Sequence, residues 1–166
     1  MKEKDFFNQL LAGWEADVRS VVEAVFPSVL SFAREEKPWR TGGWFCATIN
    51  AQSVGFPIGT LTAEDERKFR TFADEKTCRL GIYANHISSW QSRNREDQRY
   101  GGAIRVCGGA ILSFSGLSDH YDELLVLLVA MRLGAIDAAG RSRVIRASNN
   151  TRIGDYILKF GDMAPL

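Results

Sequence analysis

Apolar side chains recur at helical spacing along the first part of the chain. They are Phe6, Leu10, Trp14, Val18, Val21, Val22 and Val25. Positions three and four apart lie on one face of an α-helix, so this pattern predicts a long amphipathic helix. We expect Pro27 to end that helix and to open a second one over residues 28–36, because proline suits a first helical turn.

Residues 44–50 are rich in β-forming side chains and predict a central strand, and residues 53–58 predict a weaker one. Pro57 favours an edge position or a strand end for the second segment. Thr62 then caps a helix that we expect to reach about Leu80, with Asp65 in a position like that of a capping box.

A second pair of strands is predicted over residues 103–114. Gly108 and Gly109 form the turn between them, because glycine reaches positive φ at no steric cost. Ser118 is the expected N-cap of a very apolar helix over residues 119–133, which Gly134 ends. That helix is apolar around nearly its whole circumference, so we expect it to be buried on one side by the sheet. The N-terminal helix or a second subunit would cover the other side.

In the tail we expect a strand at Val144 and Ile145 and a short helix or strand over residues 155–160. The pattern leaves residues 82–90 open and predicts a polar, turn-rich segment over residues 91–99. Strands in hairpins with intervening helices imply an α+β fold, in which helices pack on an antiparallel sheet. The length of 166 residues suits a single domain over 1–166.

Composition excludes several classes of partner. The formal net charge is +1, which gives no reason to expect nucleic acid or an anionic membrane. No apolar run reaches the roughly 20 residues that a bilayer span needs, and the mixed charges of the N-terminus do not fit a secretory signal. Cys46, Cys78 and Cys107 lack paired spacing, so we expect free, buried thiols and a cytoplasmic location.

The segment GGAIRVCGGAILSFSGLSDHYDE, residues 101–123, resembles the GlcG/haem-degrading family, which includes the C-terminal domain of PduO-type proteins. The family's helix-borne lysine matches Lys76, and its glycine pair matches Gly101-Gly102. Its VSG motif matches residues 114–116, and its acidic DE matches residues 122–123. The resemblance covers residues 44–134, and it leaves the N-terminal helical segment 1–40 and the C-terminal tail 135–166 unexplained.

The resemblance implies a profilin-like α+β fold, a homo-oligomer and a small ligand. That ligand would be haem, another tetrapyrrole or an acidic metabolite. The apolar stripe of the N-terminal helix lies outside the family-like core and adds to the expectation of an interface.

Five residues are candidates for ligand binding, each with a structural alternative. They are Lys76, His86, Arg93, Arg105 and Ser115. His86 is the better of two histidines for ligating haem iron, although a hydrogen-bonded structural histidine is the commoner role. Lys76 lies on or beside an apolar helix face, where it either acts as a buried base or Schiff-base amine or extends its ammonium to water.

The two arginines belong to a group around residues 93–105, which suits an acidic ligand or a haem propionate. Glu96 and Asp97 lie among them, so a self-neutralised surface loop is the alternative. Ser115 ends a strand where the backbone could approach a ligand closely. We expect any site to form where the segments bearing Lys76, His86 and Arg105 converge.

Three functions remain open from the sequence. The first is binding of a small ligand, and the second is a non-catalytic oligomeric accessory protein of a metabolic operon. The third is an enzyme that uses Lys76 with Arg93 or Arg105. The chain lacks the GxSxG, HExxH and EF-hand motifs, and no other complete catalytic motif occurs in it.

Overall fold

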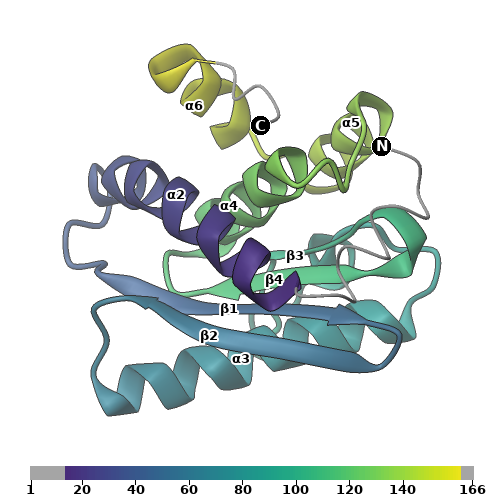
Figure 1. Ribbon diagram of the computed structural model, residues 1–166, viewed down its shortest axis with the longest axis horizontal. Coiled ribbons are helices and arrows are strands. Elements are labelled where there is room, and N and C mark those ends of the chain that lie inside the picture. Colours follow the sequence, from purple (N-terminus) through teal and green to yellow (C-terminus); the bar gives the residue numbers. More distant parts are fainter. Residues whose placement is uncertain (1–13, 162–166) are drawn as a thin grey trace.

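The computed structural model describes residues 14–161, and a four-stranded antiparallel sheet lies at its centre (Figure 1). The strands are β1 (Gly42–Ile49), β2 (Gln52–Gly59), β3 (Ala103–Arg105) and β4 (Ile111–Ser115). Their order across the sheet is β2-β1-β4-β3. The α+β class and the antiparallel sheet are therefore confirmed, with residues 44–50 beside the hairpin as predicted and Pro57 on an edge strand.

Helices cover both faces of the sheet. One face packs on α3 (Ala63–Ile82), and the other packs on α2 (Trp14–Arg34) and α4 (Asp119–Arg132) (Figure 1). Alternate residues of β1 serve the two layers: Phe45 and Ala47 join the core under α2 and α4, whereas Trp44 and Cys46 pack with Phe69 of α3. Burial on both faces explains why this strand is apolar throughout.

The tail forms two helices, α5 (Ala138–Ser148) and α6 (Arg152–Phe160). The strand predicted at Val144 and Ile145 is wrong, because both residues lie inside α5. The buried positions of α5 are Gly140, Val144 and Ser148, which follow a helical period. Two of the three are small or polar, so hydrophobicity alone did not show that period.

Within residues 14–161, no helix is long and apolar enough to cross a membrane.

Pro27 does not end the N-terminal helix, and this prediction is also wrong. It lies inside a continuous α2, whose described part begins at Trp14; Phe6 and Leu10 fall outside the described residues. Proline leaves the carbonyl of Glu23 without its helical partner, and both residues lie on the exposed face, where water can supply a donor. The apolar stripe of α2, including Val18 and Val25, is buried within the chain's own core.

Local signals at the chain's turns were mostly confirmed. Thr62 caps α3 by accepting the N–H of Asp65, and Gly108 and Gly109 both have positive φ. Ser118 precedes α4 as predicted, but its hydroxyl makes no capping bond. Of the three thiols, Cys46 is buried, Cys107 is half-buried and Cys78 is exposed, so the expectation of three buried cysteines is wrong.

Helix α4 is buried on almost all sides, as its composition predicts. Its residues from Tyr121 to Ala130 are all buried, between the sheet and helices α2 and α6. The N-terminal helix of the same chain supplies the second covering layer that the sequence required.

We predict that Leu128→Asp unfolds the protein. Leu128 is fully buried, so an unpaired carboxylate there should cost more than about 4 kcal/mol, a large share of a typical domain's stability. Circular dichroism during urea denaturation measures the change. Leu158→Asp is the matched control, because Leu158 is 88% exposed and should tolerate the charge. Similar stabilities of the two variants would contradict the packing described for α4.

Candidate functional site

A cavity of about 670 Å³, which we call the main cavity, lies where the two helical layers meet at one end of the sheet. Its wall comes from the segment after α2, from α3, from the loop over residues 95–100, from the turn between β4 and α4, and from the start of α6. This size falls within the range of small-molecule sites. The cavity therefore brings together segments that lie far apart in the sequence.

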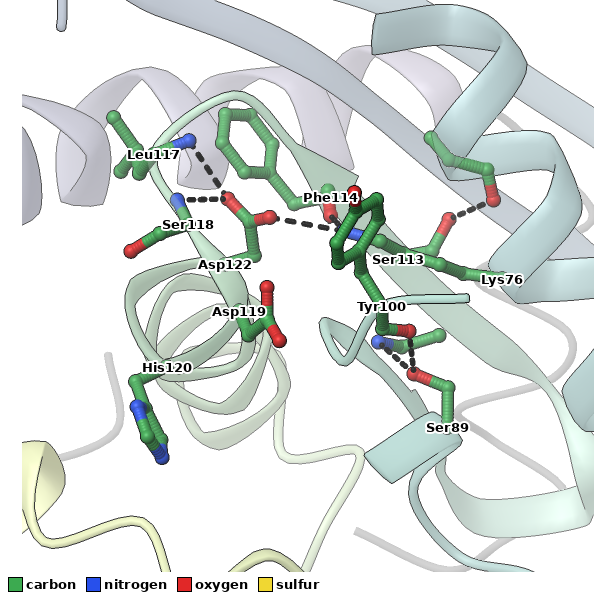
Figure 2. Close-up of polar contacts among 12 residues, drawn as sticks. Lys76, Ser89, Tyr100, Ser113, Phe114, Leu117, Ser118, Asp119, His120 and Asp122 are labelled. Carbon is green, nitrogen blue, oxygen red and sulfur yellow. Dashed lines mark hydrogen bonds and ion pairs between the residues drawn. The ribbon is translucent and has the colours of Figure 1, made fainter. Parts of the chain in front are cut away.

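A buried ion pair forms its floor. The Nζ of Lys76 on α3 lies 2.9 Å from Oδ2 of Asp122 on α4 and donates a 2.8 Å hydrogen bond to the carbonyl of Phe114 (Figure 2). The other carboxylate oxygen of Asp122 accepts the N–H groups of Leu117 and Ser118. Asp122 thereby satisfies backbone N–H groups just before α4. The sequence predicts Ser118 as the side chain that caps this helix.

Lys76 is 1% exposed, so its ammonium does not extend into bulk water. Burial raises the pKa of the Asp122 carboxyl, while the Lys76 ammonium and the two backbone N–H groups oppose that rise. Three donors converge on this one carboxylate, as an ionised acid in the protein interior requires. The snorkelling alternative for Lys76 is therefore wrong.

Gly102 allows the chain to pass directly over this pair. A β-carbon at this position would lie 2.8 Å from Lys76 Nζ and 2.6 Å from Asp122 Cβ, and the backbone φ is +116°. Both the space and the conformation therefore exclude larger residues. The glycine pair noted in the sequence serves this close approach as well as a turn.

Aromatic side chains form part of the wall above the floor. Phe72 of α3 and Tyr100 meet edge to face with ring centroids 5.4 Å apart, and Phe69 and Tyr121 also line the cavity. Burial, with a hydrogen bond to Glu36, raises the pKa of Tyr121 to about 12, so its phenol stays neutral. The wall thus offers apolar ring surfaces beside polar groups.

Six cationic side chains line the cavity, against three carboxylates. Each carboxylate already has a cation: Asp122 pairs with Lys76, Glu36 with Arg152, and Asp119 with Arg93. The other four cations form no ion pair within residues 14–161, and they are Lys37, Arg40, Lys68 and Arg95. The Nε of Arg40 is moreover buried without a hydrogen-bond partner among the described residues.

His120 also lines the cavity, at the first turn of α4. Its ring packs on Trp90 at 4.3 Å between centroids, and the guanidinium of Arg93 lies 4.4 Å above the same indole. Burial lowers the pKa of His120, and Asp119 opposes this effect while nearby arginines add to it. His120 is therefore a partly buried imidazole whose surroundings favour the neutral form.

The structure does not bring all predicted site residues together. Lys76 and Ser115 line the cavity just described, whereas His86 and Arg105 line a second cavity of about 850 Å³. Arg105 uses its guanidinium to bind the carbonyls of Leu80, Tyr83 and His86 near the end of α3. The expected convergence of Lys76, His86 and Arg105 on one site is therefore wrong.

The remaining predicted residues have partners of their own. The ring of His86 stacks on Tyr83 at 4.7 Å, and its Nδ1 is buried with no partner among the described residues. Arg93 does not line the main cavity itself. Its Nε lies 2.5 Å from Oδ2 of Asp119, which does. In the described part of the chain, no three His, Cys, Asp or Glu side chains gather as a metal site requires.

Sequence reasoning did not select the four unpaired cations as a group. Lys37 and Arg40 follow α2, Lys68 lies on α3, and Arg95 belongs to the polar loop. Single basic residues in separate segments give no local motif. Arg95 lies within the arginine group over residues 93–105, but only the folded chain places all four cations around one space.

A second buried carboxylate lies next to Asp122. Glu123 accepts hydrogen bonds from the Ser88 hydroxyl at 2.5 Å and from the Asn150 amide at 3.2 Å, and it is fully buried with no cation among these partners. Burial raises the pKa of Glu123, while hydrogen bonds from Ser148, Ser88 and Asn150 oppose the rise. This carboxyl joins α4 to the segments before η1 (Ser89–Ser92) and after α5.

Comparisons of this chain with family models, with curated proteins and with solved structures found no match. The resemblance to the GlcG/haem-degrading family therefore stays a prediction, as does the homo-oligomer expected from it. The geometry of the cavity is the basis for the functional argument.

We predict that Lys76→Met and Asp122→Asn each destabilise the protein by about 3–5 kcal/mol, because each removes one partner of a buried ion pair. The double variant should cost much less than the sum, since it leaves no unpaired charge. Urea denaturation measures all three. Asp74→Asn is the control, because Asp74 pairs with Arg70 on the surface at 3.9 Å and should change stability by less than about 0.5 kcal/mol. Additive effects would contradict the coupling.

We predict that Glu123→Gln removes a loss of stability that the natural protein suffers as pH rises. The folded-state pKa of Glu123 is raised, so its contribution is complete below its ordinary value of 4.5 and is lost as pH rises through the folded value. The variant should gain stability relative to the natural protein over the range from pH 4.5 up to the raised folded-state pKa of Glu123. Denaturation at several pH values tests this, with the exposed Glu64→Gln as control. A constant difference across that range would refute the prediction.

Proposed function

We propose that this protein binds a small anionic molecule with an apolar or aromatic body in the main cavity. The observation that supports the proposal most directly is the group of four unpaired cations, Lys37, Arg40, Lys68 and Arg95, around one space. Like charges gathered in a partly enclosed cavity repel one another and concentrate anions. A bound anion would relieve that repulsion.

The chemistry of the wall supports the rest of the ligand description. Arg40 offers a planar guanidinium, which binds carboxylate or phosphate through two parallel hydrogen bonds, and its buried Nε lacks a partner among the described residues. Phe72 and Tyr100 offer ring faces and edges on which an apolar body can stack. An anion with a ring or another apolar part suits both features.

Tetrapyrroles and acidic metabolites both belong to this class. The carboxylates of a haem would be held by cations such as Arg40 and Lys68. His120 lies in the cavity wall, and its neutral imidazole would supply a donor nitrogen to haem iron. This differs from the expectation for His86, which lines the other cavity.

We predict that Arg40→Gln and Lys68→Gln each weaken ligand binding about tenfold or more, since a hydrogen bond to a charged group contributes about 1.5–3 kcal/mol. Isothermal titration calorimetry with hemin and with phthalate measures the change. Higher ionic strength should weaken binding of both probes, because salt screens the attraction.

Arg67→Gln is the matched control. Arg67 precedes Lys68 on α3, is exposed and does not line the cavity, so its loss should leave affinity unchanged. Absence of binding by both probes, or an equal loss in all three variants, would reject the proposal.

A further inference from the structure

We propose that Lys76 forms a reversible imine with an anionic aldehyde or ketone bound in the main cavity. This proposal rests on the function proposed above, because the same cations would hold the carbonyl compound's anionic group. It goes further, since it assigns a covalent step to an amine that the structure keeps at the cavity floor.

The ammonium of Lys76 is only partly occupied by its neighbours. One N–H binds Asp122 Oδ2 and a second binds the Phe114 carbonyl, while the third has no acceptor among residues 14–161. Lys76 and Asp122 both line the cavity, so the pair borders the space in which the ligand would bind. Desolvated lysines form Schiff bases with carbonyl compounds in many enzymes.

Asp122 supplies the proton transfers that imine formation needs. The ammonium gives a proton to Asp122 Oδ2, 2.9 Å away, and the free amine attacks the carbonyl carbon, so that a C–N bond forms and the carbonyl electron pair moves to oxygen. A proton moves from nitrogen to that oxygen to give the carbinolamine. Asp122 then protonates the hydroxyl, and water leaves as C=N forms. The products are a protonated imine, one water molecule and the original carboxylate.

The surroundings favour an anionic carbonyl compound over a neutral one. Lys37, Arg40, Lys68 and Arg95 would hold the carboxylate in the same cavity that Lys76 lines, and so raise the local concentration of the carbonyl compound at the amine. The iminium keeps one N–H, which Asp122 can still accept, so the charge remains paired after the reaction.

The experiment uses the full chain with glyoxylate and sodium cyanoborohydride, which reduces the imine to a carboxymethyl group on nitrogen. Mass-spectrometric peptide mapping measures the initial rate at each lysine. We expect Lys76 to react at least about tenfold faster than the exposed Lys159 in the folded protein, and the two rates to become equal in urea. Modification of Lys159 without Lys76 would overturn the proposal.

Two further arms separate this proposal from simple binding. Arg40→Gln should slow the reaction of Lys76 with glyoxylate but leave its reaction with uncharged propionaldehyde unchanged, whereas Arg67→Gln should change neither. Equal rates with both aldehydes in the natural protein would overturn the anionic preference. Calorimetry with phthalate, which has no reactive carbonyl, tests the binding function independently. Phthalate binding with an unreactive Lys76 would reject the imine alone.

Discussion

The buried contact between Lys76 and Asp122 is the constraint on which the rest of the site depends. It joins α3, on one face of the sheet, to α4, on the other, at the end of β4 (Figures 1 and 2). An ion pair removed from water is costly unless its remaining hydrogen-bonding groups are satisfied. Here the Phe114 carbonyl and two backbone N–H groups provide that satisfaction, and Gly102 closes over the pair.

The two neighbouring carboxylates of α4 are buried in different ways. Asp122 has a cation, whereas Glu123 has only neutral donors from Ser88, Ser148 and Asn150. Consecutive helical positions point about 100° apart, so the two side chains enter different surroundings. The contacts of Asp122 form the floor of the cavity, and those of Glu123 fix α4 to the loops that follow α3 and α5. The same acidic dipeptide thus serves both the site and the fold.

The charge of the cavity follows from this arrangement. Because every carboxylate in the wall already has a cation, the other basic side chains remain available to an anion from solution. Those side chains come from α3 and from two separate connecting segments. The fold brings these separate segments around one space. Binding of an anion and the reactivity of the amine would therefore depend on the same packing.

Much of the fold could be predicted from the sequence, because local rules decided it. The β-rich segment over residues 44–50, the Thr62 cap, the Gly108-Gly109 turn and the apolar helix after Ser118 each depend on neighbours in the chain. The site could be predicted only in part: Lys76 and Ser115 line the cavity, but His86 and Arg105 line another. Tertiary structure alone decided that Pro27 stays inside a helix, that Asp122 takes the role expected of Ser118, and that four distant cations surround one space. Burial and long-range proximity decide such outcomes, and a single sequence encodes them only through the whole fold.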